Sequence, residues 1–146
     1  MARAPFQVLV IPYITRPDGA PQYAIFRRAD LGVWQGIAGG GEEGETPEQA
    51  ARREAAEEAG IPAEALLLPL TAVGRVPAAQ FAARVHWGPE VRQVPEHCFG
   101  IALSSRHLEL SSEHTAADWL DYEAAMGRLE WESNRAALEE LHFKLT

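Results

Sequence analysis

The sequence has 146 residues, of which 47% are hydrophobic and 23% charged, and its formal net charge is −8. These values are typical of one globular domain covering residues 1–146, and the negative charge argues against binding to a nucleic-acid polymer. No apolar stretch approaches the ~18 residues of a membrane span, and the first residues lack the pattern of a signal peptide. Cys98 is the only cysteine, so we expect no internal disulfide, a core role for this residue and a cytoplasmic location.

Strand-like segments lie on both sides of one central helix. The runs FQVLVIPYI and YAIFRR predict two strands, joined by the turn-forming stretch RPDGAPQ. Further strands are predicted near 66–73, 80–87, 97–103 and 117–121, and two helices near 122–129 and 134–142. This mixture predicts an α/β or α+β domain in which helices cover a mixed sheet.

The central helix has a clear start and a clear end. Thr46 can cap it, Pro47 suits its first position and Gln49 completes a Thr-x-x-Gln capping box. Gly60 is suited to the left-handed conformation that ends a helix. The segment before the helix, GGGEEGE, predicts a flexible loop that offers backbone carbonyls.

Three glutamates, Glu54, Glu57 and Glu58, project from one face of this helix. Their spacing of three and four residues places the side chains within an arc of about 100°. Repulsion at these spacings costs roughly 0.2–0.5 kcal/mol per pair. One interpretation is a solvated acidic face, partly balanced by neighbouring arginines. The other is a divalent-cation site, because Mg²⁺ prefers oxygen ligands and commonly bridges carboxylates to substrate phosphates.

The spacing of glycine and charged residues between Gly39 and Ile61 resembles the signature of the Nudix hydrolases. That signature is Gly-x5-Glu-x7-Arg-Glu-U-x-Glu-Glu-x-Gly-U, where U is a bulky aliphatic residue. One position departs from it, because Ala55 stands at the first U, which puts the packing of the helix in question more than the chemistry. The match favours the cation site over a solvated face. The matching residues are Gly39, Glu45, Arg53, Glu54, Glu57, Glu58 and Gly60.

The resemblance implies an α/β/α sandwich with a mixed sheet, in which the Nudix box, residues 39–61, forms a loop-helix-loop. It also implies hydrolysis of a nucleoside diphosphate linked to another group, with Mg²⁺ or Mn²⁺ as cofactor. Glu57 and Glu58 would be the principal metal ligands. Glu54 would bind metal, or orient and deprotonate the attacking water.

Three further box residues have implied roles. The carbonyl of Gly39 would complete the metal coordination. Arg53 would orient the glutamates through salt bridges, and Glu45 would steady the box. Gly60 keeps the structural role already expected at the end of the helix.

Segments outside the box resemble bacterial dihydroneopterin triphosphate pyrophosphatases, also labelled dATP pyrophosphohydrolases, which release pyrophosphate and leave a monophosphate. The similar segments are VWQGIAGGGEEGE, EHCFGIAL, EHTAADWL and WESNRAAL. SEHTAADWL also resembles diadenosine tetraphosphate hydrolases, so a dinucleoside polyphosphate or ADP-ribose hydrolase is the alternative. A noncatalytic nucleotide-binding module is a third hypothesis, against which the complete set of box glutamates argues.

A few candidates lie outside the box. In related Nudix enzymes a glutamate from the region of Glu113 reaches the metal site as ligand or base; the alternative here is a surface pair with His114. Trp34, directly before the glycine segment, is the best of four aromatic candidates for stacking on a base or pterin, although packing is the alternative for each. Arg27 is a second candidate for substrate binding. The other aromatic candidates are Phe81, Trp87 and Trp131.

We expect a small nucleotide or pterin phosphate as the binding partner. A homodimer is one open oligomeric state.

Overall fold

We describe residues 2–146 in a computed structural model. A seven-stranded mixed sheet has the order β3-β2-β1-β6-β5, with β4 also paired to β1 and β7 to β2. Its strands are β1 (Arg3–Thr15), β2 (Pro21–Arg28), β3 (Trp34–Gln35), β4 (Ile37–Glu42), β5 (Leu67–Pro77), β6 (Gln93–Ala102) and β7 (His114–Leu120). β1 runs parallel to β6, whereas the other pairs are antiparallel.

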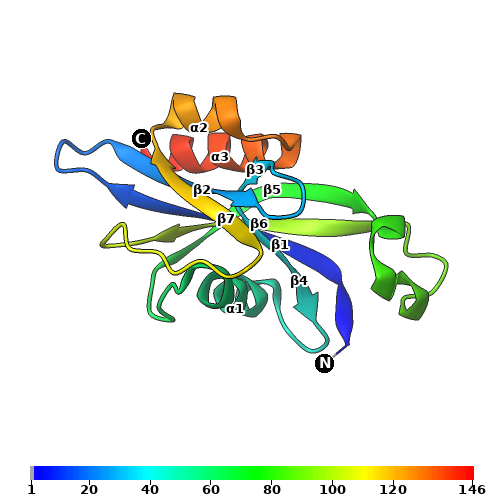
Figure 1. The fold of residues 1–146 in the computed structure, drawn as a ribbon. Helices are drawn as coiled ribbons and strands as arrows, with labels where there is room; N and C mark the ends of the chain where they lie inside the picture. The colour runs from blue at the N-terminus through cyan, green and yellow to red at the C-terminus, as the bar shows by residue number, and fades with distance from the viewer. Residues whose placement is uncertain (1) are drawn as a thin grey trace.

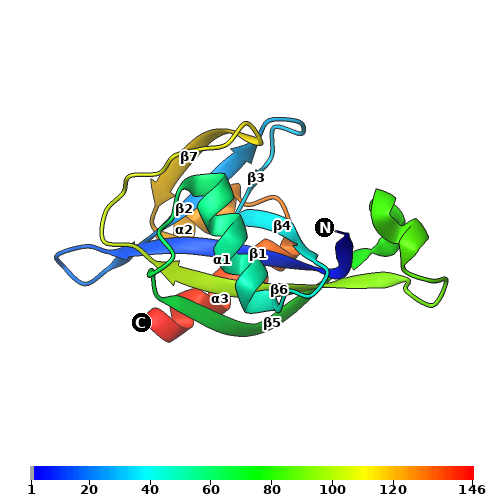
Figure 2. The same ribbon diagram turned by 90° about the horizontal axis from the view of Figure 1, so that it is seen from below.

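Helices cover both faces of this sheet, as Figures 1 and 2 show. α1 (Pro47–Ala59) lies on one face, and α2 (Tyr122–Arg128) and α3 (Glu132–Leu145) lie on the other. The predicted α/β/α sandwich is therefore confirmed. Within residues 2–146, no helix is long and apolar enough to cross a membrane.

Strand β1 contributes alternate residues to two cores, because successive side chains of a strand point to opposite faces. Val8 and Val10 pack toward α1, whose buried alanines allow a close approach. Ala55, which departs from the Nudix signature, is completely buried there. On the other face, Leu9 packs with α2 and α3, and Cys98 is buried in the same core as expected. Burial also raises the pKa of the Cys98 thiol to about 12.

Both predicted ends of α1 are present. The Thr46 hydroxyl accepts a hydrogen bond from the Gln49 backbone N–H at 3.1 Å, and the Gln49 side chain accepts one from the Thr46 N–H at 2.9 Å. Gly60 has φ 67°, which is the left-handed conformation expected of it. These local signals fix the position of α1, and therefore of its three glutamates.

The strand predicted near 80–87 is wrong. This segment forms two short 3-10 helices, η1 (Ala78–Gln80) and η2 (Ala82–His86). Ala78, Phe81 and Trp87 are spaced by multiples of three residues, the period of a 3-10 helix, and they pack into a small separate cluster. The Trp87 indole N–H also donates to the Arg3 carbonyl at 2.8 Å, so the segment folds back onto the start of β1.

The flexible loop predicted at residues 39–45 is wrong for residues 39–42, because residues 37–42 form β4. Pairing with β1 overrides the weak strand propensity of glycine. The absence of side chains is required here, since a Cβ at Gly39 would overlap the Glu54 carboxyl group. A Cβ at Gly40 would overlap the Arg3 side chain. The glycines thus admit side chains from neighbouring elements.

Strand β5 contains an irregularity between Pro69 and Val73, where its pairing register with β6 shifts. The Glu140 carboxylate on α3 accepts hydrogen bonds from the backbone N–H groups of Thr71 and Ala72 at 2.6 and 2.7 Å. It also accepts one from the Thr71 hydroxyl at 3.0 Å. One side chain therefore satisfies the donors that the shift removes from the ladder.

Candidate active site

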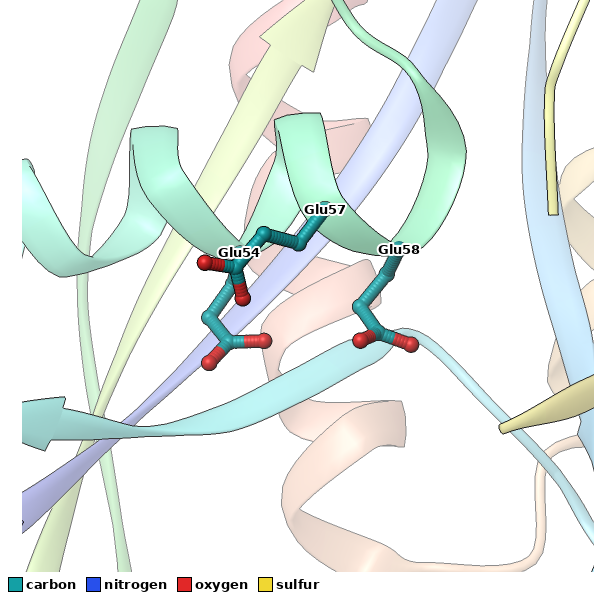
Figure 3. A group of neighbouring side chains, drawn as sticks. All are labelled: Glu54, Glu57 and Glu58. Atoms are coloured by element: carbon teal, nitrogen blue, oxygen red, sulfur yellow. The ribbon is translucent and has the colours of Figure 1, made fainter. Parts of the chain in front are cut away.

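The carboxylates of Glu54, Glu57 and Glu58 meet on one side of α1. Ligand oxygens of the three residues lie within 4.8 Å of one another. Figure 3 shows them pointing to the same side of the helix. Glu54 and Glu58 are buried, whereas Glu57 is exposed. This all-oxygen donor set fits a hard divalent cation such as Mg²⁺.

Arg53 connects this cluster to the rest of the box. Its guanidinium donates two hydrogen bonds to Glu45, at 2.8 and 3.0 Å, one to Glu54 at 3.0 Å and one to Glu57 at 3.3 Å. A fifth goes to the Gly40 carbonyl at 2.9 Å, which ties α1 to β4. The hydrogen bonds from Arg53 hold the pKa of Glu45 below its usual value, and they raise the pKa of Arg53 itself. Both groups therefore remain charged.

Glu54 has the most perturbed carboxyl group of the cluster. Burial raises its pKa to about 7, with Arg53 acting in the opposite direction and the charges of Glu57 and Glu58 adding to the increase. It lies directly against the Gly39 backbone, at the position that a Cβ of residue 39 would occupy. Such a carboxyl group changes its protonation close to neutral pH, as a general base should.

Glu58 is held by the segment that leads into β7. The Ser111 hydroxyl donates to its carboxylate at 2.7 Å, and the Ser111 backbone N–H donates to the Glu58 carbonyl at 3.2 Å. Buried His114 places Nδ1 3.5 Å from the same carboxylate. Burial lowers the pKa of His114, which favours the neutral ring. Ser111 thus restricts the orientation of Glu58, and the His114 ring lies beside the same carboxylate.

Glu113 lies next to these two residues. Its backbone N–H donates to the Ser111 hydroxyl at 3.2 Å, so one hydroxyl links Glu113 to Glu58. Burial, together with the negative charge of Glu58, raises the pKa of Glu113. Glu54, Gly39 and Glu113 line the same cavity, which has a volume of about 840 Å³. The chain thus brings a loop carboxylate and the box to one site.

Comparisons with known proteins agree with this geometry. The family model of the NUDIX domain matches residues 5–141. The chain belongs to the Nudix family. Dihydroneopterin triphosphate diphosphatase of Escherichia coli K12 is 34% identical over 140 residues, which cover 94% of this chain and 92% of that protein. The predicted family relationship is thereby confirmed.

Solved Nudix structures share the same fold. A Nudix hydrolase from Listeria monocytogenes superimposes with a TM-score of 0.87 at 38% identity, covering 97% of this chain and 94% of that one. The Escherichia coli dihydroneopterin triphosphate pyrophosphohydrolase superimposes with a TM-score of 0.78 at 30% identity, covering 99% of each chain. The Nudix domain and the curated relative identify this chain as a hydrolase of phosphoric anhydride bonds.

Two of the predicted substrate-binding residues do not line the cavity that Glu54, Gly39 and Glu113 share. Trp34 does not line it; the Arg128 guanidinium lies over its ring, 5.0 Å from the centroid. Arg27 does not line it either, and its guanidinium donates to the Thr115 hydroxyl at 3.0 Å. Among the other aromatic candidates, Phe81 and Trp131 do line the cavity. Trp34 precedes the glycine segment in sequence, but successive side chains of a strand point to opposite faces, and in β3 Gln35 lines the cavity whereas Trp34 does not.

A group of polar residues on the wall of the cavity, apart from the box, was not predicted from the sequence. Glu96 is buried in β6 and lines the cavity with Gln7 and Ser133. The signal was present: a glutamate two residues before Cys98, in a run otherwise suited to a buried strand, indicates a buried carboxylate. A buried carboxylate requires hydrogen-bond partners, and these partners come from distant parts of the chain.

Proposed function

We propose that this Nudix hydrolase is a Mg²⁺-dependent pyrophosphohydrolase of a nucleoside or pterin triphosphate, which it converts to a monophosphate and pyrophosphate. The Escherichia coli relative, named a dihydroneopterin triphosphate diphosphatase and matched over almost its whole length, supports the substrate class. The observation that carries the proposal is the meeting of three carboxylates beside a cavity of about 840 Å³. The three carboxylates would bind the cation, and the cavity beside them provides space for the substrate.

The box residues have different roles in this proposal. Glu57, Glu58 and the Gly39 carbonyl would hold the cation, with Glu54 as a further ligand or as the base. When bound, a divalent cation supplies charge that polarises the phosphoryl group and lowers the pKa of water. Glu54 would take the proton of the attacking water, to which a pKa of about 7 suits it. Glu113, which lines the same cavity, would act as a further ligand or base from the segment before β7.

Arg53 has a positioning role in this scheme. Because it binds Glu45, Glu54 and the Gly40 carbonyl at once, it fixes the distance between α1 and β4. That distance sets where the Gly39 carbonyl lies relative to the carboxylates. Preorganisation of this kind keeps the reacting groups in place without further reorganisation.

Mg²⁺ is proposed because it takes oxygen ligands and commonly bridges carboxylates to phosphates, with Mn²⁺ as the alternative. Hydrolysis of a dinucleoside polyphosphate or of ADP-ribose is the alternative, and both substrates are included in the test. We also propose that the chain acts as one cytoplasmic domain.

The test is a substrate panel with Mg²⁺, with products separated by chromatography. The panel contains dihydroneopterin triphosphate, four nucleoside triphosphates, diadenosine tetraphosphate and ADP-ribose. A monophosphate and pyrophosphate from a triphosphate support the proposal. A diphosphate and orthophosphate would place the attack at a different phosphorus, and preferred cleavage of diadenosine tetraphosphate would replace the substrate class.

A further inference from the structure

Glu96 is a buried carboxylate on the wall of the cavity, apart from the Nudix box. Its residue exposure is 4%. One oxygen accepts a hydrogen bond from the Ser133 hydroxyl at 3.1 Å, and the other accepts one from the Gln7 side-chain amide at 3.2 Å. A carboxylate offers about four acceptor positions, so each oxygen retains capacity for another donor.

The hydrogen bond from Gln7 has a fixed direction. The Gln7 carbonyl oxygen accepts from the Arg3 guanidinium at 3.2 Å, and a guanidinium can only donate. The amide nitrogen of Gln7 is therefore the group that faces Glu96. Glu96 must accept this hydrogen bond.

A second series of hydrogen bonds, on the other side of Glu96, also ends in a donor to its carboxylate. The backbone N–H of Gly36 donates to the Asn134 side-chain oxygen at 2.8 Å, so the Asn134 amide nitrogen donates to the Ser133 hydroxyl at 3.3 Å. The Ser133 hydroxyl then directs its own proton to Glu96. Burial raises the pKa of Glu96, and the two donors oppose that increase. Both series of hydrogen bonds therefore require the Glu96 carboxylate to accept.

The strand register places Glu96 at a defined distance from the box. Gln7 is paired with Glu96 on one side and with Gly40 on the other. Two strand spacings amount to about 10 Å between the backbones of Glu96 and Gly40. Gly40 is adjacent to Gly39, which contacts Glu54. Glu96 and the box residues Gly39 and Glu54 thus line one cavity at different places, and Phe81 and Trp131 also line it.

We propose that Glu96 is a specificity-determining residue that accepts two adjacent N–H groups from a 2-amino-4-oxo heterocycle, the edge shared by pterins and guanine. This inference rests on the proposed function and narrows its substrate class. Such an edge presents a ring N–H beside an exocyclic amino group, so both carboxylate oxygens are used. The triphosphate of the same molecule would then lie toward the box.

Other bases lack this pair of donors. Adenine and cytosine present an amino group next to a ring nitrogen that is itself an acceptor, which a carboxylate repels. Uracil presents one N–H between two carbonyl oxygens. A site that leaves a buried acceptor without its donor discriminates strongly against the poorer ligand. Glu96 therefore favours pterin and guanine over the other bases.

The experiment compares GTP, ITP and ATP, which carry the same ribose triphosphate. ITP keeps the ring N–H of GTP but lacks the 2-amino group. We expect the native protein to prefer GTP over ITP by about tenfold, and over ATP by about 10–100-fold, the range of a good bidentate contact. In Glu96→Gln the GTP to ITP ratio should fall toward one, because an amide cannot accept at both positions.

Two readouts separate this inference from the proposed function. kcat/KM reports on hydrolysis, and calorimetric Kd values for nonhydrolysable GTP and ITP analogues with Mg²⁺ report on recognition alone. A GTP preference in Kd without hydrolysis would overturn the proposed function and leave the role of Glu96 standing. Equal values for GTP and ITP with the native protein would overturn the role of Glu96, whatever the hydrolysis rate.

The variant needs its own controls. Glu139→Gln removes the same charge from an exposed position on α3 and should leave the GTP to ITP ratio unchanged. Circular dichroism melting checks that Glu96→Gln is folded. If it is unfolded, equal values for GTP and ITP with the native protein would still overturn the proposal, since that comparison needs no substitution. A folded Glu96→Gln that keeps the native ratio would contradict the proposal.

Discussion

Arg53 binds Glu45 with two parallel hydrogen bonds, from Nε at 2.8 Å and from Nη2 at 3.0 Å. The same guanidinium still reaches Glu54 and the Gly40 carbonyl. This pairing depends on the planar fork of arginine, because a lysine ammonium is a point charge on a flexible stem. Glu45 therefore anchors the side chain that sets the spacing between α1 and β4.

Replacement of Arg53 by lysine tests this positioning role. Arg53→Lys keeps the charge but cannot hold Glu45, Glu54 and Gly40 together. We expect kcat to fall about 10²-fold, the cost typical of a small misplacement of reacting groups. Steady-state kinetics on the best substrate of the panel measures it. Arg52→Lys is the matched control, because Arg52 donates to the carbonyls of Ala63 and Ala65, away from the glutamate cluster. Equal losses in the two variants would contradict a specific role for Arg53.

Neutralisation of the ligand candidates should remove metal binding and leave the fold intact. Glu57→Gln or Glu58→Gln keeps the shape of the side chain but removes the charge that holds a divalent cation. We expect most activity to be lost and the rise in melting temperature on adding Mg²⁺ to disappear. Without metal, each variant should melt no lower than the native protein, because like-charge repulsion is relieved.

The control for this pair is Glu64→Gln, which removes a charge from an exposed residue beyond the end of α1. It should keep both the activity and the Mg²⁺-dependent melting shift. Near-full turnover of Glu57→Gln at saturating Mg²⁺ would show that Glu57 is not an essential ligand. The same criterion applies to Glu58.

Local signals explain how much of this site was predictable. The capping residues Thr46 and Gln49 and the stop at Gly60 depend on neighbours in sequence, so they fixed the helix that carries the glutamates. The helical period alone then predicts that the three glutamates lie on one face of this helix. The strand at Gly39 was not predictable in this way, since it depends on pairing with Val8, far earlier in the chain.

Long-range packing also explains the other differences. Segment 80–87 has strand-like composition, but it folds as 3-10 helices because Trp87 returns to Arg3. The hydrogen-bond chain that holds Glu96 joins β1, β6 and α3, and no sequence period connects these elements. The family signature predicted the acidic cluster of Glu54, Glu57 and Glu58. The polar residues around Glu96 could be recognised only in the three-dimensional structure.

Stability should depend on pH through Glu140. Partial burial alone would raise its pKa, but hydrogen bonds from Thr71 and Ala72 outweigh this effect, and the pKa lies below its usual value of 4.5. A lowered folded-state pKa stabilises the protein above the unfolded pKa, and this stabilisation is lost as the pH falls through the folded pKa. Glu140→Ala should therefore cost about 1.5–3 kcal/mol at pH 7, as for hydrogen bonds to a charged group.

The difference between the native protein and Glu140→Ala should shrink below about pH 4. Urea unfolding at a series of pH values measures it. Lys144→Ala is the control, since its ammonium lies 3.9 Å from Glu140 and is partly exposed, so little stability should be lost. A difference that stays constant down to pH 3 would assign the effect of Glu140 to packing.

Glu113 carries the last prediction. Its backbone N–H donates to the Ser111 hydroxyl, which also donates to Glu58, and Glu113 lines the same cavity as Glu54. Because of this link, a rearrangement of the loop on substrate binding would also move the Glu58 carboxylate. Loops that close over a substrate commonly complete a catalytic site in this way. We therefore expect Glu113 to act on the bound substrate and to matter little for the free protein.

Glu113→Gln should lower kcat by about 10–10⁴-fold, the upper part of this range being typical of a lost general base. Kd for a nonhydrolysable substrate analogue should change much less, because we propose that Glu96 and not Glu113 recognises the heterocycle. Glu109→Gln, an exposed carboxylate in the same segment, should keep the native kcat. An unchanged kcat in Glu113→Gln would assign this residue to the solvated surface and leave the chemistry to the box glutamates. A proportional rise in Kd would make it a binding residue instead, because catalysis requires an interaction that is stronger in the transition state than in the bound substrate.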